Sequence, residues 1–475
     1  MIKSNKGKST LNRRQFVGSA SCAAIGSTTL LSSLLNLGTT NALAGLNAKS
    51  NPTEGEYKAL VCILLAGGND SFNMLVPRSK EPYREYSKSR SNLALSRSSL
   101  LSLQNKDQLG REYGVHPAMP EVQELFNLGK LSFISNVGTL VEPLTKAKYL
   151  SGGAKLPIGL LSHADQIQQW QTSLPNSRSS KGWGGRMADI LEQGNRNQDI
   201  SMNISLSGTN VFQVGANATE YAIRSSADGS VGISVYEGQN RLDRLLRKGT
   251  ESLLAQQYQD IFKSTFQQKI AHSQANHQIF SEALANTSSL STGFSSAALS
   301  ADLALVAKTI AARKTLGMKR QTFFINYGGW DHHDSVLENQ TLMLSILSKA
   351  LQAFQTAIEE LGVAEQVTTF TISDFGRTLT SNGNGTDHAW GGNVLAMGGA
   401  VNGGQIFGTY PSLQIGGPDD IGGAILLPSI STDIYFAELA RWFGVSGGDL
   451  SYVLPNITRF YDTQSKQSPI GFMKP

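Results

Sequence analysis

Short runs rich in apolar residues constrain the fold of this chain more than any other feature. They cover residues 58–66, 131–137, 321–326 and 367–373. Such runs are typical of strands that are buried on both faces of a sheet. Between them lie segments with apolar residues at helical spacing, the clearest at 335–361. Strands that alternate with helices predict an α/β fold, a three-layer sandwich whose mainly parallel central sheet is flanked by helices.

One segment breaks this alternation. Residues 237–285 are rich in Gln, Asn and Ala, with Leu at helical spacing, and a Ser/Thr-rich connector follows at 286–300. The pattern predicts a helical insertion at about 237–300 that covers the sheet. The chain of 475 residues is long enough for a large core. We expect a single domain over 58–475, preceded by a linker at 45–57.

The first 44 residues have the composition of a targeting segment. The sequence Asn12–Val17, NRRQFV, resembles the twin-arginine export signal, and Ala42–Ala44 provides the small residues of a cleavage site. A basic tail before a weak membrane anchor is less favoured, because Gly, Ser and Thr dilute the apolar stretch. We expect the twin-arginine export machinery to deliver the protein to the periplasm, without a transmembrane helix.

The excess positive charge of the chain lies in this leader. Its five basic residues are accompanied by no Asp or Glu. Subtracting them from the 41 Lys and Arg residues leaves 36, which equals the number of Asp and Glu residues. The remaining chain therefore has no global attraction for nucleic acid, and we expect no nucleic-acid partner.

Cysteine usage excludes several kinds of site. Cys22 lies in the leader, which leaves only Cys62 in the remaining chain. One cysteine forms no internal disulfide, and it supports neither an iron–sulfur cluster nor a Cys-rich zinc site.

Acidic and histidine residues follow three of the predicted strands, and a fourth group of them lies in a loop. The segments are Gly67–Ser71, Tyr327–Asp334, Asp374–Thr378 and Gly385–Gly392. Any single Asp after a strand has about even odds of being only a helix cap or a turn residue. Ligands of α/β proteins, however, bind at the carboxyl ends of strands. Together, the carboxylates and imidazoles predict a hydrolytic metal centre, with zinc or manganese at its His-containing part.

A further segment places Ser162 and His163 at the start of a predicted helix. The helix dipole and an adjacent metal would activate Ser162 as a nucleophile, and His163 is a candidate general acid or base. The alternative is that Ser162 only caps the helix, with Asp165 completing the turn. The residues alone slightly favour the cap.

The motifs as an ordered set resemble the bacterial domain-of-unknown-function 1501 family. They are the twin-arginine leader, Leu-Ala-Gly-Gly-Asn-Asp, Gly-Gly-Trp-Asp-His-His, Ser-Asp-Phe-Gly-Arg-Thr and Gly-Thr-Asp-His, spread over nearly all of the chain. That family is placed in the alkaline phosphatase and sulfatase superfamily. The resemblance implies a sheet flanked by helices and a two-metal site.

The resemblance also implies roles for individual residues. Asp331, His333 and His388 resemble the ligands of one metal. Asp70 resembles the first-strand ligand of the other, and Asp374 the Asp of the superfamily's Asp-His pair. Ser162 stands where the phosphatases carry their nucleophile. Arg377 and Asn69 are candidates for binding an anionic substrate, although an Arg at a strand end is more often an ion-pair partner.

The chain departs from the superfamily pattern at two places. Phe375 stands where a metal-binding histidine is usual. The second site is therefore weak, takes an oxygen-preferring ion such as calcium or magnesium, or is empty. The formylglycine motif Cys-x-Pro-x-Arg is absent, which excludes the conventional sulfatase mechanism.

These observations predict an exported metal-dependent hydrolase of phosphate or sulfate esters. Its substrate would be a small anionic ester, free or linked to a glycan. One alternative is a catalytically degenerate binding or assembly protein on the same fold, which the residue Phe375 favours. Another is a phosphoryl transferase. A fold by itself does not decide between them.

Overall fold

The computed structural model describes residues 56–227, 229–230, 241–257 and 259–475. The predicted leader at 1–44 and all but the last two residues of the predicted linker at 45–57 lie outside the described residues. The described residues belong to one compact unit, residues 52–475.

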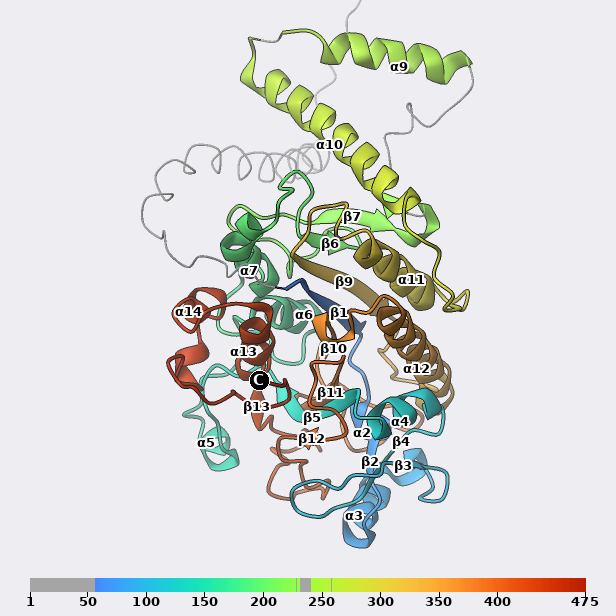
Figure 1. Ribbon diagram of the computed structural model, residues 1–475. Coiled ribbons are helices and arrows are strands. Elements are labelled where there is room, and N and C mark those ends of the chain that lie inside the picture. The colour runs from blue at the N-terminus through green and yellow to red at the C-terminus, as the bar shows by residue number, and fades with distance from the viewer. Residues whose placement is uncertain (1–55, 228, 231–240, 258) are drawn as a thin grey trace, which may run out of the picture. The chain divides into compact units, whose positions relative to one another are not determined.

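A ten-stranded sheet runs through the described part of the molecule (Figure 1). Its order is β12-β5-β11-β10-β1-β9-β6-β7-β8, and β13 also pairs with β5. The strands are β1 (Lys58–Ala66), β5 (Leu131–Gly138), β6 (Asn203–Ser205), β7 (Tyr221–Arg224), β8 (Gly229–Ser230), β9 (Arg320–Gly328), β10 (Val367–Ser373), β11 (Gly392–Met397), β12 (Ile406–Phe407) and β13 (Ile430–Ser431).

Most neighbouring strands of this sheet are parallel. Strand β11 runs antiparallel to both β10 and β5, and β8 runs antiparallel to β7. The other pairings among the described strands are parallel. The predicted mainly parallel sheet is therefore confirmed, and the four predicted strands agree with β1, β5, β9 and β10 to within two residues.

The central strand β1 shows why its sequence is apolar from its second residue to its last. Its alternate side chains enter two separate cores. Ala59, Val61, Ile63 and Leu65 lie in one core, and Leu60, Cys62 and Leu64 lie in the other. Successive side chains of a strand point to opposite faces. A strand covered on both faces therefore favours apolar residues on both.

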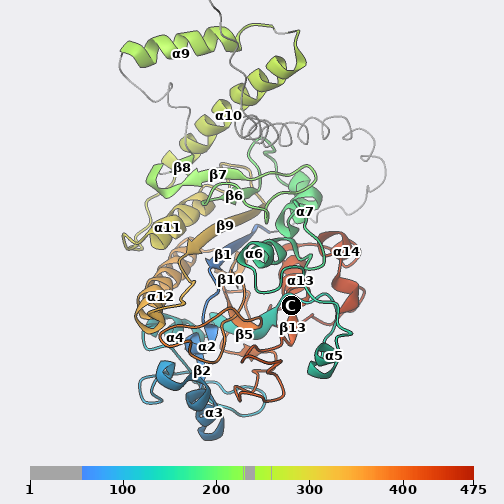
Figure 2. The same cartoon turned by 180° about the vertical axis from the view of Figure 1, so that it is seen from behind.

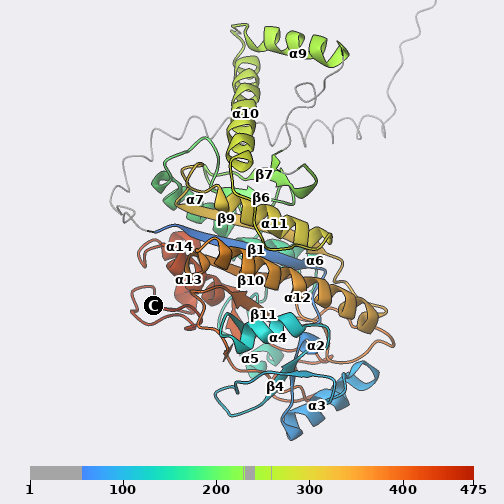
Figure 3. The same cartoon turned by 45° about the vertical axis from the view of Figure 1, so that its right-hand side comes forward.

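Two helical layers cover the sheet (Figures 2 and 3). One core joins it to α4 (Pro120–Asn127), α11 (Ala298–Ala311) and α12 (Val336–Glu360). The other joins it to α6 (His163–Thr172), α7 (Trp183–Leu191), α13 (Thr432–Phe443) and α14 (Leu450–Val453). The predicted three-layer sandwich is confirmed. Helix α12 agrees with the predicted helix at 335–361.

A smaller antiparallel sheet follows β1 along the chain. It has the order β2-β4-β3, from Leu75–Pro77, Tyr113–Val115 and Leu101–Ser102. Three further helices are α2 (Ser71–Met74), α3 (Lys80–Arg90) and α5 (Lys146–Leu150).

Two helices, α9 (Arg241–Leu254) and α10 (Ile261–Ala285), lie in the segment predicted as a helical insertion. The last turns of α10 enter the core with Phe280, Ala283 and Leu284, beside β8 at the edge of the sheet. No residue of α9 is buried, and α9 contacts α10. Among the helices that the structure describes, none has the length and apolarity that a membrane span requires.

Candidate metal centre

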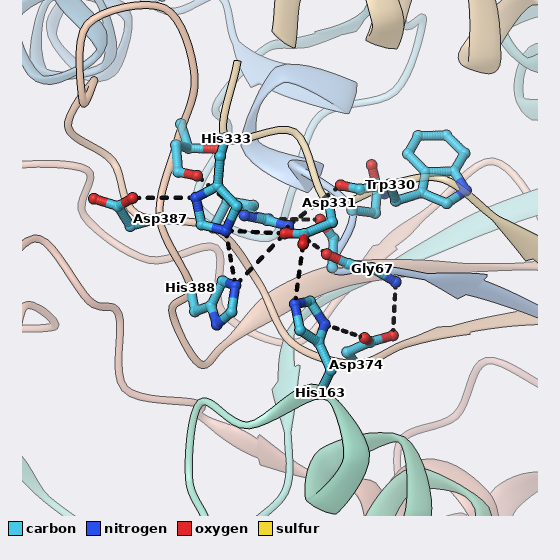
Figure 4. Close-up of polar contacts among 12 residues, drawn as sticks. Gly67, His163, Trp330, Asp331, His333, Asp374, Asp387 and His388 are labelled. Carbon is cyan, nitrogen blue, oxygen red and sulfur yellow. Dashed lines mark hydrogen bonds and ion pairs between the residues drawn. The ribbon is translucent and has the colours of Figure 1, made fainter.

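Four chain segments meet at the carboxyl ends of β9 and β10 (Figure 4). The loop after β9 carries Asp331 and His333, and the loop after β10 begins with Asp374. His388 comes from the connection between β10 and β11, and His163 is the first residue of α6. The sheet thus brings together five of the residues predicted for the site.

Asp331 lies at the centre of this cluster. Its Oδ1 is 3.0 Å from Nε2 of His333 and 3.5 Å from Nε2 of His388. Its Oδ2 is 3.3 Å from Nε2 of His163. The carboxylate is 46% exposed, so an ion or a small molecule reaches it from solvent.

The Nδ1 atoms of His163, His333 and His388, which we call the outer nitrogens, all contact oxygen atoms of the protein. The Nδ1 contacts are from His163 to Asp374 Oδ2 at 2.7 Å, from His388 to the Leu161 carbonyl oxygen at 2.8 Å, and from His333 to Asp387 Oδ1 at 3.3 Å. A carbonyl only accepts, so Nδ1 of His388 is the donor and its Nε2 carries the lone pair. Metal-binding histidines are held in this way by carboxylates or carbonyls.

The Nε2 atoms of these imidazoles, which face Asp331, are positioned to bind a metal ion. One ligand atom from each of His163, Asp331 and His388 lies within 4.8 Å of the others. Nε2 of His163 is buried without a hydrogen-bonding partner. Nε2 of His333 lies 2.9 Å from Nε2 of His388. Two imidazoles and one carboxylate, with His333 beside them, match the ligands that zinc and manganese accept, and calcium is a poor match.

The charge states of the cluster suit metal binding. Partial burial opposes ionisation of Asp331, but the hydrogen bond and charge of Arg377, with His163 and His333, lower its pKa below the ordinary value. Burial and the nearby charges of His163 and Arg377 lower the pKa of His388. At neutral pH Asp331 is therefore ionised and His388 neutral, as ligands must be. Burial raises the pKa of Asp374 above its ordinary value, and the hydrogen bond from His163 offsets this rise only in part.

A strained turn at Leu161 directs the contact with His388. Leu161 has φ 71°, a conformation that costs energy for a residue with a side chain. The turn aims its carbonyl oxygen at His388, and its N–H donates to Gln166 Oε1 at 2.6 Å. Ser162 follows as the N-cap of α6, and its Oγ accepts from Asp165 N at 3.5 Å. The predicted cap is confirmed, and Ser162 directly precedes His163, a member of the cluster.

Phe375 packs beside two of the imidazoles. Its ring centroid lies 4.8 Å from that of His163 and 4.6 Å from that of His388, and only 2% of the residue is exposed. Gly68 makes room for the ring, since a Cβ there would lie 2.6 Å from it. Gly68 also has φ 84°, which favours glycine. The phenyl ring therefore fills space beside the cluster.

The two predicted substrate-binding residues are buried. Arg377 donates to the carbonyl oxygens of Gly67, Gly68 and Thr386 and to the Asp331 carboxylate. Its guanidinium thus links the loop after β1 to the loops that follow β9 and β10. Asn69 is 2% exposed and lines a cavity of about 10 Å³, the size of one water molecule. Their substrate-binding roles stay predictions.

Asp70 is held by an arginine and not by a member of the cluster. Its Oδ2 forms an ion pair with Arg90, and both side chains are almost wholly buried. Arg90 also donates to Asn73 Oδ1 at 3.1 Å and to the Thr378 carbonyl oxygen at 3.0 Å. The other oxygen of Asp70, Oδ1, is buried without a partner. Its role as a ligand of a second metal stays a prediction.

The sequence matches one protein family over most of its length. The family model is described as "Protein of unknown function (DUF1501)", and it covers residues 57–446. The chain belongs to the DUF1501 family. The match includes all five members of the cluster and confirms the predicted family. No curated protein matches the chain.

Several solved structures resemble this DUF1501 chain in outline. The lipoteichoic acid synthase LtaP from Listeria monocytogenes is 10% identical, over 91% of this chain and 81% of that one, with a TM-score of 0.36. The PsFucS1 sulfatase from Pseudoalteromonas sp. is also 10% identical, over 87% and 72%, with a TM-score of 0.32. The C-terminal periplasmic domain of EcEptC from Escherichia coli, in complex with Zn, is 11% identical over 73% and 75%, with a TM-score of 0.29.

Proposed function

We propose that this protein is an exported metal-dependent hydrolase of phosphate or sulfate esters. The observation that carries the proposal is the convergence of three imidazoles on Asp331, each held at its outer nitrogen by the protein. His163, Asp331, His333 and His388 would hold one divalent metal, with zinc or manganese preferred. Export to the periplasm rests on the leader motif Asn12–Val17.

The proposed chemistry divides between the metal and the chain. A bound divalent ion polarises an ester oxygen and stabilises negative charge on it. Ser162 supplies the nucleophilic hydroxyl from the N-terminus of α6, where the helix dipole favours its ionised form. Asp374 keeps the proton of His163 on Nδ1, and the Leu161 carbonyl does the same for His388. In this scheme His163 is a ligand, and the general acid or base is a separate group.

A second metal has fewer residues available. Asp70 and Asp374 are the predicted ligands, with calcium or magnesium as the preferred ion. Asp70 is engaged by Arg90 and Asp374 by His163. The proposal therefore requires one metal per chain, and the second site remains a separate prediction.

The competing function is a binding or assembly protein with one structural metal. The burial of Arg377 and Asn69 favours it, because a hydrolase of anionic esters needs accessible positive groups. A phosphoryl transferase would use the same centre with an acceptor other than water.

Metal content and hydrolysis, measured on the same samples, test the proposal. Elemental mass spectrometry should find close to one zinc or manganese per chain, and p-nitrophenyl phosphate or sulfate should be hydrolysed. His388→Ala and His163→Ala should lose both metal and activity, and Ser162→Ala should lose activity alone. His272→Ala, an exposed histidine on α10, is the matched control. Metal without hydrolysis of any ester would favour the binding protein, and a metal-free folded chain would refute the site.

A further inference from the structure

The helices α9 and α10 expose an unusual number of apolar side chains. We define the amphipathic tip as α9 together with residues 261–266 of α10. It exposes seven large apolar side chains: Leu242, Leu245, Leu246, Leu253, Ile261, Phe262 and Phe266. The exposed fraction ranges from 46% for Leu246 to 67% for Ile261. Single exposed apolar residues are ordinary, but a contiguous group marks a site of interaction.

In α9 these side chains occupy one face. At about 100° per residue, Leu242, Leu245, Leu246 and Leu253 fall within an arc of about 100°. Arg241 and Lys248 border this arc on one side, and both are exposed. Arg244 and Arg247 lie on the opposite face. An apolar arc with arginine and lysine beside it is typical of a helix that lies in the plane of a membrane surface.

The tip is also a positive region on a neutral chain. Helix α9 has four basic residues and two acidic ones, and Lys263 is the one charged residue of 261–266. Without the leader, the chain carries 36 basic and 36 acidic residues, so this charge is local. Positive charge beside an apolar face is complementary to an anionic lipid headgroup layer over acyl chains.

We infer that the amphipathic tip docks on the surface of an anionic phospholipid membrane. Leu and Phe side chains enter the acyl boundary, and the exposed Arg241, Lys248 and Lys263 contact the headgroups. The leader of this chain is a poor occupant, because it carries five basic residues and no acidic one. A second copy is also disfavoured, because it would bring two positive tips together. The inference is independent of the proposed hydrolase, since the tip contains none of its residues.

Vesicle flotation tests the inference. The probe is a vesicle of equal parts phosphatidylglycerol and phosphatidylcholine, with pure phosphatidylcholine as the neutral reference. The full chain should bind the anionic vesicles more strongly, and added salt should weaken the binding. Leu242→Asp/Leu245→Asp/Leu246→Asp should lower the partition coefficient at least about ten-fold. No residue of α9 is buried, so this variant keeps the fold.

Two controls keep the result interpretable. Leu128→Asp/Leu342→Asp changes exposed leucines elsewhere and should bind as the parent does. The basic leader is common to all samples, so the difference between them isolates the tip. Equal binding by the triple variant, or no preference for anionic vesicles, overturns the inference. Concentration-dependent self-association that the triple variant abolishes, without vesicle binding, assigns the face to a second copy and also overturns it.

Discussion

At the scale of single residues, His163 connects the centre to the interior. Its Nδ1 contacts the buried Asp374, and its Nε2 faces the exposed Asp331 (Figure 4). Asp374 in turn accepts from Gly67 N at 3.0 Å. The orientation of this imidazole therefore depends on β1, β10 and α6 together.

Phe375 should set the geometry of the imidazoles. We expect Phe375→Leu to weaken metal binding about ten-fold, because the smaller side chain leaves the rings of His163 and His388 unsupported. Metal titration against a competing chelator measures this, and nitrogen NMR of the imidazoles in the metal-free protein gives a second readout. Phe126→Leu, equally buried in α4, should keep the metal affinity. Equal loss in both variants would assign Phe375 to the core alone.

Asp70 and Arg90 should behave as a buried ion pair. Arg90→Met leaves the Asp70 carboxylate buried and unpaired, and we expect it to lower the free energy of unfolding by about 3 kcal/mol. Adding Asp70→Asn should recover most of this loss. Urea unfolding measures both, with metal content as the companion readout. If Asp70→Asn alone removes one metal equivalent, the ligand role that the sequence predicts is correct.

The sequence indicated which residues gather at the strand ends better than it indicated their contacts. Asp331, His333 and His388 were recognisable because acidic and histidine residues follow strand ends. The contacts of His163 with Asp331 and Asp374 were not predictable, because nothing in the sequence says which way an imidazole at a helix start turns. Its role as an acid or base stays a prediction. Arg90 was missed altogether, since its partnership with Asp70 depends on how α3 packs.

At the scale of elements, the buried strands were the most predictable. The predicted bounds of β1 and β10 equal those observed. All of β10 and the interior of β1 are buried, and β10 carries β-branched Val, Thr or Ile at five of its seven positions, which favours a strand. The short strands β6, β7 and β8 gave no signal of their own. Pairing with a neighbouring strand, rather than local sequence, makes them strands.

A buried carboxyl group on α13 should lower the free energy of unfolding as pH rises. Burial raises the pKa of Asp433 to about 7, only partly offset by Ser173 and Arg186. Between about pH 4 and pH 7 the native state then binds more protons than the unfolded state, so stability falls with rising pH. Asp433→Asn should remove this fall and be more stable than the parent at pH 8, by about 2 to 4 kcal/mol. Urea unfolding at pH 4.5 and 8 is the measurement. If the free energy of unfolding changes by the same amount between these pH values in both proteins, the expectation is contradicted.

At the scale of the whole molecule, the metal should join segments that are distant in sequence. Removal by chelator should lower the thermal midpoint, because an ion at a thousand times its dissociation constant contributes about 4 kcal/mol. Calorimetry with and without chelator checks this, and zinc should restore the midpoint. The His163→Ala/His388→Ala variant should be insensitive to chelator. An unchanged midpoint for the parent would argue against a site that contributes to stability.

The position of β5 in the sheet has a consequence for biosynthesis. Its partners β11, β12 and β13 all come from residues 392–431, whereas β5 itself ends at residue 138. While a ribosome makes the residues between them, β5 has none of these strands to pair with, and its unpaired backbone N–H and C=O groups are open to other chains. The order of synthesis therefore leaves β5 without its native neighbours until residues 392–431 have been made.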